Sequence, residues 1–131
     1  MLFIARMVQL TILCGISKYS CMGFCSIGVA LVGKKDRAAY DYGQLSLQLL
    51  EKVKAKELVP WVNSLFYSQI YPWYASVHDS ISVLAKMTCI SLETGSHESS
   101  IICSDTFCQR SFCCGKSLTK LKDDIEEVRV T

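Results

Sequence analysis

Hydrophobic residues recur at intervals of three and four along most of this chain, the spacing that places side chains on one face of an α-helix. The clearest example is the stretch 39–54 with the preceding Ala38. Here Ala38, Tyr42, Leu45, Leu49 and Val53 follow one another in steps of three or four residues. We predict an amphipathic helix over this stretch, with these five side chains on its buried face.

Helical spacing or continuous apolar character extends over further segments, so we predict six or seven helices in all. The other segments are 8–15, 21–32, 60–72, 76–93, 97–115 and the stretch from Ser117 onward. The side chains predicted to face the core of the last three are Val77, Ile81, Leu84 and Met87; Ile102, Phe107, Cys108 and Phe112; and Leu118, Leu121, Ile125 and Val128. Because Gly and Pro interrupt helices, we expect stops at Gly33, Pro72, Gly95 and Gly115, and Asp36 to cap the helix that follows it.

The turns near Gly33, at 73–76 and near Gly115 recur about every 40 residues, a period typical of helical solenoid repeats. Each unit pairs a strongly apolar first helix with a more amphipathic second helix, as stacked hairpins require. We therefore predict an all-α fold in one domain, 1–131, with repeats at roughly 17–54, 60–95 and 97–130. A compact helical bundle would show similar amphipathicity, but the long-range period favours a solenoid.

The first fifteen residues allow two interpretations. Arg6 precedes an apolar run at 7–14, which is the order found in a signal peptide. However, Gln9 and Thr11 interrupt the run and no Ala-x-Ala cleavage site follows, so a buried first helix is favoured. In the alternative, residues 1–15 are removed and the chain is a small secreted cysteine-rich protein. No apolar run reaches the ~18 residues of a membrane span, so none is expected.

Composition narrows the partners of the protein. Half of the residues are hydrophobic and the mean hydropathy is +0.27, which indicates faces that pack against a neighbour. The net charge of +2 and the scattered Lys and Arg residues disfavour nucleic acid. Eight cysteines fall mostly inside apolar helices, where a free thiol packs as a small hydrophobe. Disulfides belong to the secreted alternative, and neither a metal site nor a cofactor is expected.

Two motifs suggest chemistry, and neither is convincing. Residues 28–35 nearly match the phosphate-binding loop G-x-x-x-x-G-K-[ST], but Lys35 replaces the hydroxyl and the interior of the loop is apolar. A hydrolase using Cys89, His78 and Asp79 has no support in their spacing, because His78 and Asp79 are explained as the polar first turn of a helix. We therefore predict no catalytic residues.

Aromatic residues cluster at 61–74, where their helical spacing favours packing between helices. The alternative is a groove that binds a ligand or peptide. If the chain has a partner groove, we expect it at Phe66, Tyr67, Ile70 and Tyr74.

One segment resembles a known family. Residues 40–52, YDYGQLSLQLLEK, followed by Ala55, Lys56 and Glu57, are similar to a G-Y-x-F-G-Q-L-A-L-x-L-L-E-K-x-x-A-K-E segment. That segment belongs to the tetratricopeptide-like region of large signalling proteins that combine a serine/threonine kinase-like domain, an AAA/STAND-type ATPase, a GAF domain and often a histidine kinase. Weaker matches follow at 91–95 and 115–118, so the resemblance covers roughly 8–129. The chain departs from the family's pattern at 36–39 and in its cysteine content.

The resemblance implies a fragment of a larger protein: about three tetratricopeptide-like hairpins in a short right-handed solenoid. The kinase, ATPase and phospho-accepting motifs of the family have no counterpart here. The implied role is a non-catalytic scaffold in the cytoplasm, which presents a helical surface to a partner protein or to a neighbouring domain of the same polypeptide.

Overall fold

The computed structural model describes the backbone of residues 1–130 and the side chains of residues 1–127. Its regular elements are all helical, so the all-α prediction is confirmed for this part of the chain. The helices are α1 (Leu2–Cys14), α2 (Ser20–Val32), α3 (Ala38–Val53), α4 (Val59–Leu65), α5 (Val77–Glu93), α6 (His97–Cys113) and α7 (Leu118–Val130). A 3₁₀ turn, Lys56–Leu58, precedes α4, which continues as a π-helical turn, Phe66–Ile70, and a 3₁₀ turn, Tyr71–Trp73.

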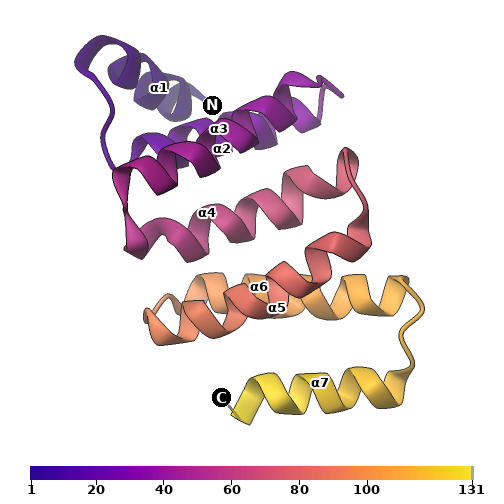
Figure 1. Cartoon of the computed structure of the whole chain (residues 1–131). Coiled ribbons are helices and arrows are strands. Elements are labelled where there is room, and N and C mark those ends of the chain that lie inside the picture. Colours follow the sequence, from indigo (N-terminus) through magenta and orange to yellow (C-terminus); the bar gives the residue numbers. More distant parts are fainter. Residues whose placement is uncertain (131) are drawn as a thin grey trace.

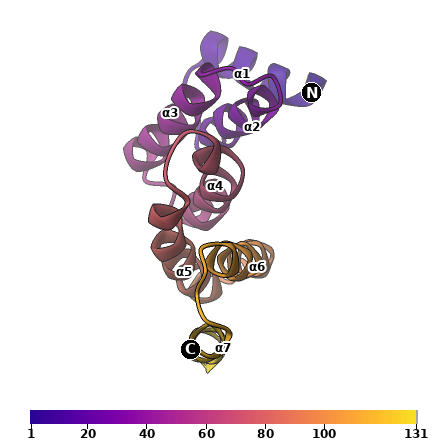
Figure 2. The ribbon, with the colours of Figure 1, turned by 90° about the vertical axis from the view of Figure 1, so that its right-hand side faces the viewer.

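The helices stack in the order in which they occur along the chain, and the two ends of the chain lie at opposite ends of the stack (Figure 1 and Figure 2). The closest helix pairs are α2 with α3 and α5 with α6, while α4 lies between them and contacts both. The first pair coincides with the predicted repeat 17–54. The second pair spans Gly95, where we predicted a boundary between repeats, so the close pairing there is shifted by one helix.

The predicted turn residues are mostly confirmed. Gly95 and Gly115 follow the ends of α5 and α6 with φ of +74° and +80°, a left-handed conformation that glycine adopts without strain. Asp36 caps α3, because its Oδ1 accepts a hydrogen bond from the Ala38 N–H at 3.0 Å. Gly33 is not the left-handed residue of its turn, since its φ is −60°; Lys35, with φ of +55°, takes that role.

Two apolar cores hold the stack together. The first lies among α2, α3 and the long α4 segment, and it consists of Cys21, Cys25, Leu49, Leu50, Ala55, Val62, Phe66 and Ile70. The second lies among α5, α6 and α7, and it consists of Leu84, Met87, Cys103, Phe107 and Leu121. Val59 and Tyr67 pack against both cores, so the segment from α4 to the π-helical turn joins the two halves.

The buried face of α3 differs from the prediction. Its most deeply packed side includes the small residues Ala39, Gly43 and Ser46, whereas Leu45 is exposed. The reason is a close approach of helices: a Cβ on Gly28 of α2 would come within 2.9 Å of the Ala39 carbonyl oxygen. The buried face of α3 is therefore offset by about one residue from the predicted face, and its small side chains lie toward the neighbouring helices.

Several predicted core residues lie on the surface. The first helix begins at Leu2 rather than at residue 8, and none of its described residues is buried, so the expected buried first helix is wrong. Ile102, Phe112, Leu118 and Ile125 are exposed as well. The side chain of Val128 lies outside the described residues. Within the part of the chain that the structure covers, no helix has the length and apolar character needed to cross a bilayer.

Pro72 ends the fourth helix, as expected. Because proline has no N–H, it cannot donate to the Ser68 carbonyl four residues earlier, which is its normal acceptor in an α-helix. The Arg110 Nη2 of α6 donates to this carbonyl oxygen instead, at 3.1 Å. One guanidinium therefore completes the end of one helix and links it to the second half of the stack.

Candidate binding groove

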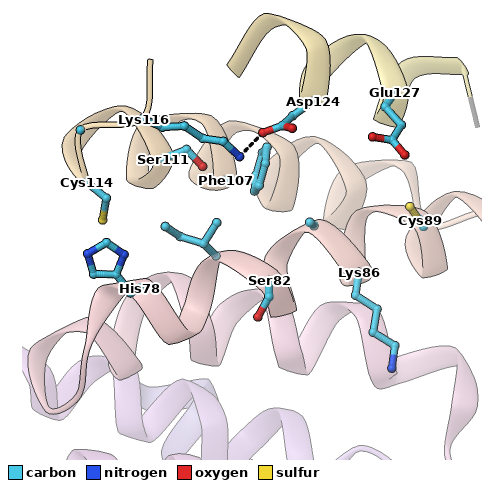
Figure 3. A pocket seen from close by; sticks show the side chains of 13 residues that line it. His78, Ser82, Lys86, Cys89, Phe107, Ser111, Cys114, Lys116, Asp124 and Glu127 are labelled. Carbon is cyan, nitrogen blue, oxygen red and sulfur yellow. Dashed lines mark hydrogen bonds and ion pairs between the residues drawn. The ribbon is translucent and has the colours of Figure 1, made fainter. Parts of the chain in front are cut away.

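A groove of about 850 Å³ runs between α5 and α7, with α6 behind it (Figure 3). It is lined by His78, Ile81, Ser82, Ala85, Lys86, Cys89, Phe107, Ser111, Cys114, Gly115, Lys116, Asp124 and Glu127. Helix α7 packs on the second core through Leu121, while Leu118 and Ile125 of the same helix stay exposed. Because α7 makes so narrow a contact, it leaves one side of α5 uncovered.

The wall formed by α5 is one continuous helical stripe. The lining positions 78, 81, 82, 85, 86 and 89 follow the i, i+3, i+4, i+7, i+8, i+11 pattern of a single face. At 1.5 Å per residue, this stripe is roughly 17 Å long, or about three helical turns. Its centre is apolar, with Ile81 and Ala85, and its ends carry His78 and Cys89.

The floor comes from α6. Phe107 is buried there, and the Lys116 ammonium lies 5.9 Å from the centre of its ring, a cation–π arrangement. Ser111 is fully buried beside it, and its Oγ has no hydrogen-bond partner among the described residues. Because this oxygen has no exposed surface, it offers no hydrogen bond to a group bound in the groove.

The rim carries charges of both signs. The Lys116 Nζ donates to the Asp124 Oδ2, and this ion pair joins the middle of α7 to the loop after α6 (Figure 3). His78 and Cys114 face each other at the end of the groove where α5 begins, and Lys86 and Glu127 lie toward the opposite end. With two lysines and two carboxylates, the rim has no net charge when His78 is neutral.

The four residues predicted for a partner groove lie elsewhere. Phe66 and Ile70 are fully buried in the first core, so their placement in a surface groove is corrected. The physical reason is the π-helical turn, which directs both side chains between α2 and α3. A Cβ on Gly43 would come within 2.5 Å of the Phe66 ring, which shows how closely the two helices enclose it.

Tyr67 and Tyr74 are half-buried and already engaged. The Tyr67 ring packs edge-on against Phe66, with centroids 5.0 Å apart, and burial raises the pKa of its hydroxyl. Tyr74 packs against Tyr40 and donates its hydroxyl hydrogen to the Asp36 carbonyl oxygen at 2.7 Å. The Tyr74 contacts join the end of the long α4 segment to the start of α3, whereas the Tyr67–Phe66 contact lies within that segment. Packing of this kind is what the helical spacing favoured.

The cysteines are free thiols with very different surroundings. Cys21, Cys25 and Cys103 are buried, while Cys14 and Cys113 are exposed. Burial raises the pKa of Cys25 to about 12 and that of Cys103 to about 11. These two thiols therefore stay protonated and unreactive at neutral pH. No group of three or more metal-ligating side chains occurs among the described residues.

Neither the near phosphate-binding loop at 28–35 nor the set of Cys89, His78 and Asp79 forms a catalytic arrangement. Residues 28–32 of the near phosphate-binding loop are helical, and Gly28 lies at the contact between α2 and α3. His78 and Cys89 both line the groove, but eleven helical residues, or roughly 17 Å, separate them along α5. They therefore do not form a nucleophile–base pair.

Sequence reasoning identified the components of α5 but not the groove. The face predicted to be buried included Ile81, and the groove uses this residue together with Ala85 on the next turn. The signal that was available is the stripe from His78 to Cys89, in which small or polar residues alternate with apolar ones. That α7 leaves the stripe open depends on tertiary packing.

The comparisons with known proteins give no relative: no family model, no curated protein and no solved structure matches this chain.

Proposed function

We propose that this protein is a non-catalytic helical-repeat scaffold that binds an amphipathic helix in the groove between α5 and α7. The observation that carries the proposal is the uncovered stripe of α5, three turns long, with α6 as its floor. A helix packs against such a stripe by placing its own ridge of side chains between those of α5. Recognition of a helix in a groove is a common mode of binding between proteins.

The chemistry of the groove supports an amphipathic occupant. Ile81, Ala85 and Phe107 offer an apolar strip for residues spaced at i, i+3, i+4 and i+7 of a partner. The mixed charges of the rim suit a helix that carries both acidic and basic residues, rather than a polyanion such as nucleic acid.

The tetratricopeptide-like solenoid expected from the sequence is part of the same proposal. The stacking of paired helices and the resemblance of residues 40–57 to the helical region of signalling proteins support tetratricopeptide-like hairpins in a short right-handed solenoid. On this proposal the chain is a segment of a larger cytoplasmic signalling protein. Its partner is a neighbouring domain of the same polypeptide or a second protein. The proposed binding site is the α5–α7 groove, in place of the groove expected from the sequence at Phe66 and Tyr67.

The experiment is a selection of α-helical peptides from a displayed library on the immobilised full chain. Selected peptides should share an apolar stripe and bind Ala85→Arg at least tenfold more weakly, because the new side chain fills the centre of the groove. The matched control is Gln48→Arg, an exposed position on α3, which should leave the affinity unchanged. Peptides that show no common stripe, or that bind Ala85→Arg as well as the original chain, would contradict the proposal.

The second candidate function is that of a small secreted cysteine-rich protein from which residues 1–15 are removed, and one observation favours it. Helix α1 contributes no buried residue among those described, so its removal would leave both cores complete. Analysis of the chain purified from its own cells decides between the two. A chain that starts after Gly15 and moves differently on non-reducing and reducing gels supports secretion and disulfides, whereas an intact first helix with eight titratable thiols excludes it.

A further inference from the structure

Helix α1 carries a large apolar surface that the rest of the fold does not cover. Its inner side, formed by Ile4, Met7, Val8 and Thr11, is only partly shielded by α2. On the outer side Leu2 is 91% exposed and Leu13 is 76% exposed, and Phe3, Leu10 and Ile12 are exposed as well. The helix lies at one end of the stack, away from the α5–α7 groove (Figure 1).

A single cation lies in the middle of this outer surface. At about 100° per residue, the side chains of Leu2, Phe3, Leu10 and Leu13 all lie within about 60° of Arg6 around the helix axis. Within the described part of the chain Arg6 makes no ion pair, and its one contact is a long 3.5 Å hydrogen bond to the Gln9 side chain. Arg6 is therefore exposed among four large apolar side chains and is available to pair with an external anion.

The charge of the surrounding segment has one sign. Residues 1–35 contain Arg6, Lys18, Lys34 and Lys35, and they contain no aspartate or glutamate. Lys18 forms an exposed ion pair with Glu57 at 3.2 Å, whereas Arg6, Lys34 and Lys35 form no ion pair among the described residues. Arg6 is the only cation of α1 itself, and Lys18, Lys34 and Lys35 lie in the turns before and after α2, so the positive charge that attracts anionic headgroups belongs to the segment 1–35 as a whole.

We propose that α1 is a membrane-surface helix, which buries Leu2, Phe3, Leu10 and Leu13 in the interface of a bilayer containing anionic phospholipids. Arg6 reaches outward along the apolar surface to lipid phosphates, as long cationic side chains do at interfaces. A second copy of the chain is a poorer occupant, because a symmetric contact through this face would bring two Arg6 side chains together without a carboxylate. The inference is independent of the proposed function, since the α5–α7 groove lies at the other end of the stack and stays free.

The test is flotation of the full chain with vesicles of phosphatidylcholine, with and without phosphatidylserine. The chain should float with the anionic vesicles, and Leu13→Glu and Phe3→Glu should each reduce binding at least tenfold, because each removes a large apolar side chain from the interface. Arg6→Gln should lower the preference for phosphatidylserine about fivefold. Since these side chains are exposed, the variants should retain the helical circular dichroism of the original chain.

The matched control is Ile101→Glu, an exposed apolar residue on α6 that should leave flotation unchanged. Equal losses for Ile101→Glu and Leu13→Glu would show general stickiness and overturn the proposal. So would a chain that never floats with anionic vesicles. A dimer that Leu13→Glu dissociates in sedimentation velocity, without any flotation, would assign the surface to self-association instead.

Discussion

Replacing Gly43 with alanine tests how tightly α3 packs on the Phe66 ring. A Cβ at this position would come within 2.5 Å of the Phe66 Cε2 and within 3.2 Å of the Ile70 Cδ1. Phe66 is fully buried, and its ring is held by Tyr40, Tyr67 and Tyr71 at centroid distances of 5.0 to 5.9 Å. The ring therefore has no free volume into which it can move.

Two effects of opposite sign decide the magnitude. Alanine in the middle of a helix stabilises it by about 1 kcal/mol relative to glycine. Forcing an extra methyl group into a well-packed core costs about 1–3 kcal/mol, and a contact of 2.5 Å with a rigid ring belongs at the upper end of that range. We expect Gly43→Ala to lower the free energy of unfolding by about 1–2 kcal/mol.

Urea unfolding followed by far-ultraviolet circular dichroism measures this value. The matched control is Gly23→Ala in α2, where the new Cβ would meet Met7 at an ordinary 3.4 Å. That variant should be neutral or up to about 1 kcal/mol more stable. Combining Gly43→Ala with Phe66→Leu should cost less than the sum of the two single changes, because the smaller side chain makes room. Equal stabilisation by both alanines would refute the close approach.

Three further predictions concern buried polar groups at other positions in the stack. Ser91, which is fully buried with its hydroxyl bonded to the Met87 carbonyl oxygen, should tolerate alanine within about 1 kcal/mol, whereas leucine should cost about 1–3 kcal/mol in urea unfolding. Arg110→Met should lower stability by about 1–3 kcal/mol, because the Ser68 carbonyl loses its donor; a thermal melt unchanged from the original chain would show that this link is not needed. The Cys25 thiol has a pKa of about 12 in the folded chain and 9.0 when unfolded, so the folded state binds the proton more tightly and stability falls as pH rises above 9. From about pH 8 to about pH 10, the free energy of unfolding measured in urea should therefore fall more for the original chain than for Cys25→Ala. The limiting slope of this difference is about 1.4 kcal/mol per pH unit. Equal losses in the two proteins would contradict the assigned pKa.

The sequence by itself determined the helical class and most helix ends, because these depend on local properties. Spacings of three and four residues mark helices whatever surrounds them. Gly95 and Gly115 end helices because glycine adopts a positive φ without strain, and Pro72 ends one because it lacks an N–H group. The capping of α3 by Asp36 follows from the same local chemistry.

The buried face of each helix was harder to predict from the sequence, because small residues make the closest contacts between helices. Ser46, Ser80 and Ser91 are all fully buried, and each donates its hydroxyl hydrogen to a carbonyl oxygen of its own helix. A serine satisfied in this way is buried at little cost and lets two helices approach closely. A search for large apolar residues misses such positions, which is why the predicted face of α3 was displaced by about one residue.

Only the tertiary structure decided where surfaces remain open. The aromatic cluster around Phe66 has the composition of a binding groove, but the π-helical turn and Gly43 enclose it in the core. The groove between α5 and α7 exists because α7 rests on the stack mainly through Leu121, and α1 is exposed because only α2 packs closely against it. Such outcomes depend on the angles and distances between helices far apart in the sequence, and periodicity carries no information about them.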